Sequence, residues 1–275
     1  MRISLCNEVI RELPFERQCE LVKKLGYDGL EIAPVTLSDD PPKITAARRA
    51  ELKKIAADNG IAIAGLHFLM VAPAGLSITT KDDAVRARSV EIVRALCGLA
   101  ADLGAKLLIH GSPVQRQVEP GDEAEGKKRG FESFAAAAAA AEKAGVTYLV
   151  EPLAPQDTGF VTSVDEALAI VHAINSPALK TMIDCSAMGR AGFDVPALIR
   201  KHLPTGLVAH IHLNDPNRRG PGEGEMKFTP ILAALFEMKY TGMASIEPFI
   251  YEPDGSTCAA RQIGYVRGVI EAVKA

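Results

Sequence analysis

The sequence carries little net charge and few aromatic side chains. Its 31 basic and 34 acidic residues leave a formal charge of −3 over 275 residues, and only 5% of the residues are Phe, Trp or Tyr. A nucleic-acid-binding protein presents a basic stripe, often with aromatic residues that stack on the bases. Acidic and basic residues are interspersed along this chain instead, so we expect neither nucleic acid nor an anionic membrane surface as a partner.

Long hydrophobic runs and paired cysteines are absent as well. No apolar stretch is long enough to cross a bilayer, and residues 1–8 lack the apolar core of a secretion signal. The five cysteines are odd in number and widely separated, and none forms a C-x-x-C pair. Scattered cysteines are typical of reduced thiols, so the sequence predicts a cytoplasmic protein with no membrane segment.

Short segments rich in β-branched residues alternate with longer helical patterns along the whole chain. We expect strands at Arg2–Cys6, Gly29–Ile32, Ile61–His67, Lys106–His110, Thr147–Glu151, Lys180–Asp184, Val208–Leu213 and Met243–Glu247. We expect helices at Glu16–Leu25, Ala46–Asn59, Ala84–Leu103, Phe131–Ala144, Val164–Ile174, Val195–His202, Thr229–Met238 and Ala259–Val273. Several of these helices end at a glycine, which is the residue favoured at a left-handed C-cap.

Eight strand–helix units predict an α/β fold, a single (β/α)8 TIM barrel that takes in residues 1–275 as one domain. Each unit has about 34 residues, which suits such a barrel, and a hydrophobic content of 48% provides a large core. The longest predicted linker, Ser112–Gly130, follows the fourth strand and contains Gly and Pro. It is either a lid or a solvated insertion, because loops after strands stand on the catalytic face.

Polar side chains stand where seven of the eight strands give way to loops. They are Glu31, His67, His110, Glu151, Asp184, His212 and Glu247. The last four belong to strands five to eight, which are neighbours in a barrel. Three carboxylates brought together raise one another's pKa values unless a cation lies between them. Oxygen-rich ligation with one imidazole favours a single Mn²⁺ ion, with Mg²⁺, Co²⁺ or Zn²⁺ as alternatives.

The seventh strand has two histidines on one face, His210 and His212. His212 is nearest the following loop, and we expect it to be the metal ligand. We expect His210 to lie in the core or to orient a ligand.

Motifs in the second half of the chain resemble those of a known family. They are Glu151-Pro152-Leu153, Ile183-Asp184, His210–Asp215, Arg218, Pro221–Gly224 and Ile246–Phe249, in this order. The order is similar to that of xylose-isomerase-like TIM barrels, and in particular to the sugar isomerase and epimerase branch with the D-tagatose and D-psicose 3-epimerases. The resemblance extends over essentially the whole chain and implies the same barrel fold.

The resemblance also implies one divalent cation and a role for each matched ligand. Glu151, Asp184, His212 and Glu247 would hold the cation. Glu151 and Glu247 would in addition move the proton.

Further matched positions imply contacts with the substrate. Arg218 and Asp157 occupy positions that bind substrate in the epimerases. His67 and the Gly111–Arg116 loop fit a less characterised branch of the same group. We include His67 and His110 among the expected substrate contacts. Ala187 departs from the pattern because the epimerases have a substrate-binding histidine there, so the resemblance does not name the sugar.

We therefore expect a metal-dependent sugar isomerase or epimerase that moves a proton at the carbon next to a carbonyl through an enediolate, with two glutamates as acid and base. The expected substrate is a free sugar, a polyol or a sugar acid. A phosphate dianion is disfavoured because Glu223 and Glu225 closely follow Arg218 and Arg219 in the loop after strand seven. A homodimer or homotetramer is compatible with this function.

Three other functions remain open. A lyase of the inosose or 3-dehydroshikimate dehydratase type needs the same cation and the same proton removal. An endonuclease IV-like DNA repair enzyme shares the fold and related ligands, but the acidic balance of the chain counts against it. A non-catalytic sugar-binding barrel is disfavoured because both proton-transfer glutamates are present.

Overall fold

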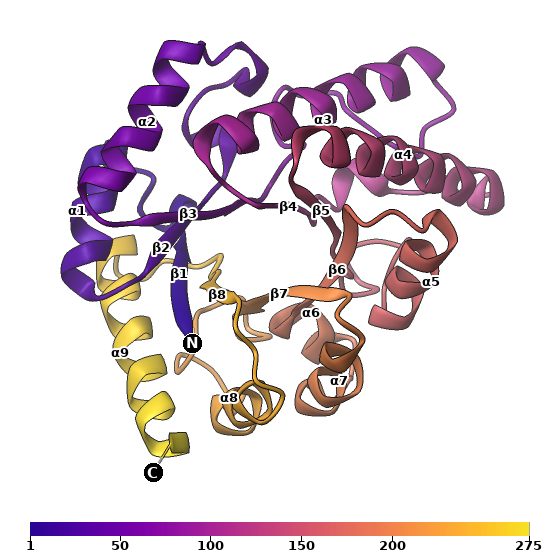
Figure 1. Cartoon of the computed structure of the whole chain (residues 1–275). Helices are drawn as coiled ribbons and strands as arrows, with labels where there is room; N and C mark the ends of the chain where they lie inside the picture. Colours follow the sequence, from indigo (N-terminus) through magenta and orange to yellow (C-terminus); the bar gives the residue numbers. More distant parts are fainter. Residues whose placement is uncertain (275) are drawn as a thin grey trace. The chain divides into compact units, whose positions relative to one another are not determined.

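The computed structural model describes residues 1–274, which contain eight strands in a closed barrel (Figure 1). The strands are β1 (Arg2–Cys6), β2 (Gly29–Ile32), β3 (Ala62–Leu66), β4 (Leu107–His110), β5 (Thr147–Val150), β6 (Leu179–Asp184), β7 (Val208–Leu213) and β8 (Met243–Ile246). They follow one another in sequence order, and neighbours such as β1 and β2 or β4 and β5 are parallel. The predicted (β/α)8 barrel is confirmed.

The helices of residues 1–274 follow the strands. They are α1 (Phe15–Leu25), α2 (Ala46–Asp58), α3 (Asp83–Leu103), α4 (Glu123–Ala144), α5 (Val164–Ile174), α6 (Cys185–Arg190), α7 (Val195–His202), α8 (Phe228–Glu237) and α9 (Gly255–Lys274). Short 3-10 helices are η1 (Asn7–Ile10), η2 (Pro34–Thr36), η3 (Pro41–Lys43), η4 (Val114–Arg116) and η5 (Leu203–Thr205). Within this described part, no helix combines the length and the apolar character that a membrane crossing requires.

Local capping explains where α3 begins and ends. The Asp82 side chain accepts hydrogen bonds from the backbone N–H groups of Ala84 at 2.9 Å and Val85 at 3.1 Å. Gly104 closes the helix with a left-handed φ of 81°, as expected from the glycine pattern. Both ends of this long helix are therefore specified by the sequence next to them.

The predicted start of α4 at Phe131 is wrong, because the helix begins at Glu123. Gly126 and Gly130 suggested a loop, yet they lie inside the helix where neighbours approach closely. A Cβ on Gly126 would lie 2.8 Å from Val118 Cγ1, and one on Gly130 would overlap the ring of Phe160. The glycines therefore mark tight packing, and the linker before α4 is shorter than predicted.

Helix α6 was not predicted. The side chain of Asp184 caps it by accepting a hydrogen bond of 2.6 Å from the backbone N–H of Ala187. Six residues are too few for a helical hydrophobic period to be recognised.

The chain divides into two compact units, and each is described by itself. The first unit comprises residues 1–32, 54–64 and 182–274, and the second comprises residues 33–53 and 65–181. Strands β1, β2, β7 and β8 lie in the first unit, and β4 and β5 lie in the second.

Strand register in the first unit aligns the carboxyl ends of its strands. Cys6 of β1 is opposite Glu31 of β2, and His212 of β7 is opposite Ser245 of β8. Gly29 permits the close approach of β2, since a Cβ there would lie 2.7 Å from the carbonyl oxygen of Ala62. Polar residues of separate strands thus arrive at the same level.

Candidate metal and substrate site

Three of the predicted metal ligands lie together in the first unit. Asp184 ends β6, His212 lies in β7, and Glu247 directly follows β8. The Nδ1 atom of His212 lies 2.8 Å from Oε2 of Glu247 and 3.5 Å from Oδ2 of Asp184. All three side chains are buried, with exposed fractions of 3% or less. The structure therefore gathers one imidazole nitrogen and two carboxylates at a single buried point.

Glu31 holds the imidazole from its other side. Its Oε1 lies 3.0 Å from Nε2 of His212, and its Oε2 lies 2.7 Å from Nε2 of His210. The same Oε2 accepts a hydrogen bond of 2.5 Å from the hydroxyl of Ser245. Metal-binding histidines usually have a carboxylate at their second ring nitrogen, so the position of Glu31 beside Nε2 would suit a cation bound at Nδ1. Sequence patterns placed Glu31 at a strand end but did not predict this contact.

The charges of this group perturb one another strongly. Burial alone would raise the pKa of Glu31, but the charges of His210 and His212 outweigh it and hold that pKa well below its usual range. Burial alone would lower the pKa of His212, but the Glu247 and Glu31 carboxylates hold it well above its usual range. The negative charge around His212 therefore stabilises a positive charge at Nδ1, which either a proton or a divalent cation would supply.

Asn214 joins the two acidic residues and was not predicted. Its amide nitrogen donates to Oδ2 of Asp184 at 2.8 Å and to Oε2 of Glu247 at 3.3 Å. Its carbonyl oxygen accepts from the backbone N–H of Ser186 at 2.8 Å. Asn214 lies directly after β7, two positions beyond His212. This position next to a strand end was the only sequence signal that it belongs to the site. Asn214 fixes the oxygens that face Nδ1 of His212.

Glu151 lies in the second unit, directly after β5, and is 5% exposed. Its backbone N–H donates to the carbonyl oxygen of His110 at 3.3 Å. A Cβ on Gly111 would overlap the Glu151 carboxylate, so a side chain at position 111 would displace that carboxylate. The fourth predicted ligand thus has a defined, buried place, and its assignment to the metal site stays a prediction.

The other predicted substrate contacts of the second unit are buried or half-buried. His110 is 1% exposed, and its Nδ1 lies 2.8 Å from the hydroxyl of Tyr148. Burial, and then the charge of Arg116, lower the pKa of His110 to about 3, so its ring is neutral. His67 follows β3 and is 1% exposed, and Asp157 lies half-buried in the loop after β5. Their contact with a substrate stays a prediction.

Arg218 occupies a constrained position in the loop after β7. Its φ of 69° is unusual for a residue other than glycine, and its carbonyl oxygen accepts from the N–H groups of Phe249 at 2.8 Å and Ile250 at 3.1 Å. The guanidinium lies 5.1 Å from the centre of the Phe249 ring. These contacts tie Arg218 to the segment that begins with Glu247, where a substrate contact is expected.

The neighbouring charges of the same loop have partners in the protein. Arg219 forms an ion pair with Glu252, and Glu223 forms one with Arg261. The Glu223 carboxylate also accepts a hydrogen bond of 2.6 Å from Gln262. The contacts of Glu223 anchor the loop to α9, and Arg219 is held by Glu252 in the segment just before that helix.

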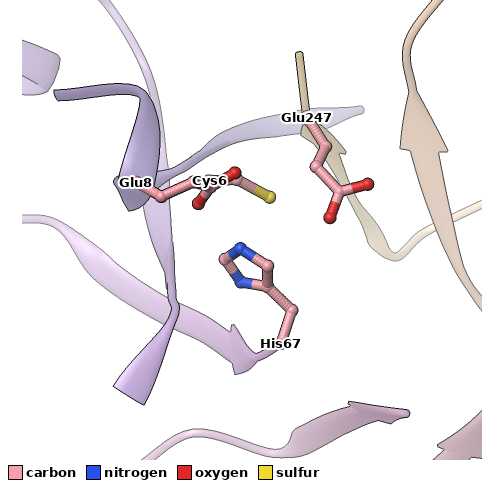
Figure 2. Close-up of side chains that lie close together, drawn as sticks. All are labelled: Cys6, Glu8, His67 and Glu247. Atoms are coloured by element: carbon pink, nitrogen blue, oxygen red, sulfur yellow. The ribbon is translucent and has the colours of Figure 1, made fainter. Parts of the chain in front are cut away.

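A further group of donor atoms adjoins Glu247 in the first unit. Cys6 ends β1, Glu8 lies in η1, and each offers a ligand atom within 4.8 Å of one on Glu247. Figure 2 shows Cys6, Glu8 and Glu247. The charges of this group act on Tyr251. Burial raises its pKa above the ordinary value, and Glu8, Glu247 and Cys6 raise it further. Sequence patterns missed Cys6 and Glu8 because β1 was the one strand given no polar end.

The donor set fits a divalent cation. Asp184 and Glu247 supply oxygens, His212 supplies one nitrogen, and Glu31 and Asn214 orient them. Oxygen-rich ligation with one imidazole suits Mn²⁺, Mg²⁺ or Co²⁺. The Cys6 thiol is the softer ligand and would favour Zn²⁺ if it took part.

Comparison with known proteins gives one family match and many relatives. The model of the xylose isomerase-like TIM barrel family matches residues 19–267. A D-psicose 3-epimerase from Agrobacterium fabrum is 28% identical over 238 residues, which are 84% of this chain and 78% of that protein. An L-ribulose 3-epimerase from Mesorhizobium japonicum is 26% identical over 86% of this chain and 76% of its own.

Solved structures show the same fold. A D-psicose 3-epimerase from Clostridium cellulolyticum H10, crystallised with D-tagatose, has a TM-score of 0.85 and is 22% identical. The match covers 98% of this chain and 99% of that one. An AP endonuclease, family 2, from Brucella melitensis has a TM-score of 0.73 at 21% identity over 96% and 98% of the two chains. At these identities the likeness concerns the fold, which both groups share.

Proposed function

The chain belongs to the xylose isomerase-like TIM barrel family, and from that premise we propose that it is a divalent-metal-dependent sugar epimerase or isomerase. It would move a proton at the carbon next to a carbonyl through an enediolate. The observation that carries the proposal is the buried group of Asp184, His212 and Glu247 around one imidazole nitrogen. The names of the relatives, which are sugar 3-epimerases, support the same conclusion.

We propose Glu151 as the fourth ligand, beside Asp184, His212 and Glu247. The barrel order supports this, because the carboxyl ends of β5 and β6 are neighbours in a closed barrel. The cation, with Mn²⁺ as the first choice, would polarise the substrate carbonyl and orient the adjacent hydroxyl.

The two glutamates would act as acid and base. Each has a carboxylate at the end of its own strand, and β5 and β8 are separated by β6 and β7 in the barrel order. Glu151 and Glu247 would therefore approach the substrate from different sides, one removing the proton and the other returning it to the opposite face. Isomerisation uses the same groups, with the proton returned to the adjacent carbon.

Other side chains would position the sugar. We propose that Arg218, His67, His110 and Asp157 contact substrate hydroxyl groups. Ala187 is buried, and its N–H is used to cap α6. The contacts of the histidine found there in epimerases would thus fall to other residues, and the preferred sugar would differ from theirs.

A dehydratase on the same barrel is the alternative, since it begins with the same proton removal and adds an elimination step. We also propose that residues 1–275 act as one domain in the cytoplasm. The chain would form a homodimer or homotetramer, which light scattering of the eluted protein tests.

The test is a panel of ketoses, keto sugar acids, aldoses and inososes incubated with the Mn²⁺-loaded protein and followed by NMR. An epimer of a ketose or of a keto sugar acid as product supports the proposal. Loss of water from an inosose, or no product from any member of the panel, contradicts it. Separate incubation with DNA that contains abasic sites tests the repair function, and strand cleavage would favour it.

A further inference from the structure

Arg116 in η4 is the bulkiest fully buried side chain of residues 1–274. Its exposed fraction is 0%, and none of its three guanidinium nitrogens has a hydrogen-bond partner within that described part. Most buried polar groups in native proteins are paired, and a buried charge without a partner is costly. A functional reason is therefore required for keeping an arginine here.

The backbone around Arg116 is firmly held in the second unit. The carbonyl oxygen of Gln115 accepts from the N–H of Ile78 at 2.8 Å, and the side chain of Gln117 donates to the carbonyl oxygen of Asp157 at 2.5 Å. The carbonyl oxygen of Arg116 itself accepts from the hydroxyl of Thr158 at 3.4 Å. The burial of its side chain thus belongs to a fixed segment with contacts on both flanks.

The charges near Arg116 place it beside a predicted catalytic group. Burial lowers the pKa of Arg116 to about 10, while carboxylates, Glu151 first, act in the opposite direction, so the side chain is charged at neutral pH. The nearby His110 ring is neutral, and its buried Nε2 also has no partner within residues 1–274. One cation and one neutral imidazole, each with a buried nitrogen that has no hydrogen-bond partner in residues 1–274, therefore lie at the end of β4 and in η4 after it.

A guanidinium binds a carboxylate through two parallel hydrogen bonds, and the buried Arg116 offers all of its donors. The carboxylates around Arg116 disfavour a dianion more strongly than a single negative charge. Glu151, Asp157 and Glu166 are close enough to act on Arg116, and they would repel a phosphate dianion. Resting on the proposed function, we propose that the substrate is a keto sugar acid whose carboxylate is bound by Arg116, next to Glu151.

The test uses sugars that differ at one carbon. D-Tagatose, D-tagaturonate and D-tagatose 6-phosphate carry a hydroxyl, a carboxylate and a phosphate at the same end of the chain, and the three D-fructose counterparts repeat the comparison. Their affinities for the metal-loaded protein are measured by calorimetry. Because Arg116 has no exposed surface, the ligand must displace neighbouring side chains, and the measurement is made at equilibrium.

We expect the wild type to bind the ketonates about 10- to 100-fold more tightly than the neutral ketoses, since a hydrogen bond between charged groups typically increases affinity by this factor. Arg116→Met should lose the difference and keep its affinity for the neutral ketoses. Arg94→Met is the matched control, because Arg94 is an exposed arginine on α3 of the same unit, and it should behave like the wild type.

Three results would overturn the inference. They are equal affinity of the wild type for ketonates and neutral ketoses, a ketonate preference that survives Arg116→Met, and a larger, Arg116-dependent preference for the phosphates. If Arg116→Met does not fold, Arg116→Lys takes its place. A lysine lacks the paired donors and should weaken ketonate binding about tenfold or more, and unchanged binding would refute the proposal. Binding is read without turnover, so a protein that binds ketonates through Arg116 but converts none contradicts only the proposed function.

Discussion

Replacing Glu31 by Gln should weaken metal binding although Glu31 is not a predicted ligand. The Glu31 carboxylate lies beside the Nε2 atoms of His210 and His212, and it accepts a hydrogen bond from the hydroxyl of Ser245. A glutamine has one acceptor oxygen where Glu31 has two. Its amide NH₂ would therefore lie against at least one of the groups, His210, His212 or Ser245, that now contact a carboxylate oxygen. The imidazole of His212 would lose both its orientation and the charge that strengthens Nδ1 as a donor.

The size of the effect follows from these contacts. Loss of a carboxylate behind a metal-binding histidine typically costs about 10- to 100-fold in metal affinity, or about 1.4–2.7 kcal/mol. Because Glu31 and both histidines are fully buried, breaking the group should also lower the free energy of unfolding of the metal-free protein by roughly 3–5 kcal/mol. The unfolding loss should therefore exceed the loss of binding energy.

Competition with a fluorescent chelator measures the Mn²⁺ affinity, and urea denaturation measures stability. Asp28→Asn is the matched control, since Asp28 also accepts hydrogen bonds in the first unit, from the N–H of Ile3 at 2.8 Å and from Arg267 at 2.9 Å. It should leave Mn²⁺ affinity unchanged. A folded Glu31→Gln protein that binds Mn²⁺ within twofold of the wild type would refute this account of Glu31.

The remaining predictions concern the ligands, the proton transfer and pH. His212→Ala should remove the one coordinated nitrogen that electron spin echo spectroscopy detects on bound Mn²⁺, and His210→Ala should retain it; the reverse pattern would exchange their roles. Glu151→Gln and Glu247→Gln should keep most of the metal and lower turnover about 10²–10⁴-fold, as steady-state kinetics would show, whereas full activity in both would end their role as acid and base. In the metal-free protein, the charged form of Glu31 stabilises the fold above its ordinary pKa of 4.5, and the charged form of His212 does so fully below its ordinary pKa of 6.5. Thermal stability should therefore be greatest between these two pH values, and a maximum above pH 7 would contradict the charge assignments. Gly111→Ala should displace Glu151 and lower turnover without unfolding the protein, which circular dichroism and activity together would check.

Strand positions were predicted to within one residue because β-branched runs and helix-capping glycines are local signals. The pattern of Val208–Leu213 specified a strand without reference to any other segment, and β7 has these bounds. The start of α4 was predicted wrongly because the prediction used only local signals. Gly126 and Gly130 suggest a loop in their own stretch of sequence, but in the structure they allow Val118 and Phe160 to pack closely against the helix. A close contact between distant segments leaves no mark on its own stretch of sequence.

In the candidate site, too, local features could be predicted from the sequence and contacts between distant segments could not. A polar residue at a strand end is visible in the sequence, and this signal predicted Asp184, His212 and Glu247, whose side chains lie close together in the structure. The contact of Glu31 with His212 joins residues 181 positions apart, and it depends on the level at which β2 and β7 end. The unpartnered guanidinium of Arg116 is likewise a property of packing, because a single arginine in a polar linker is usually solvated.

The central claim is that one cation, held by Asp184, His212, Glu247 and Glu151, enables proton transfer at the carbon next to a carbonyl. Its most direct test is the rate at which deuterium from D₂O enters a bound ketose as Mn²⁺ is added to the metal-free protein. The account predicts no exchange without metal, an increase up to one equivalent of Mn²⁺ per chain, and deuterium at one carbon. Exchange that persists after chelation, or Mn²⁺ at one equivalent with no exchange into any ketose or keto sugar acid, would contradict it.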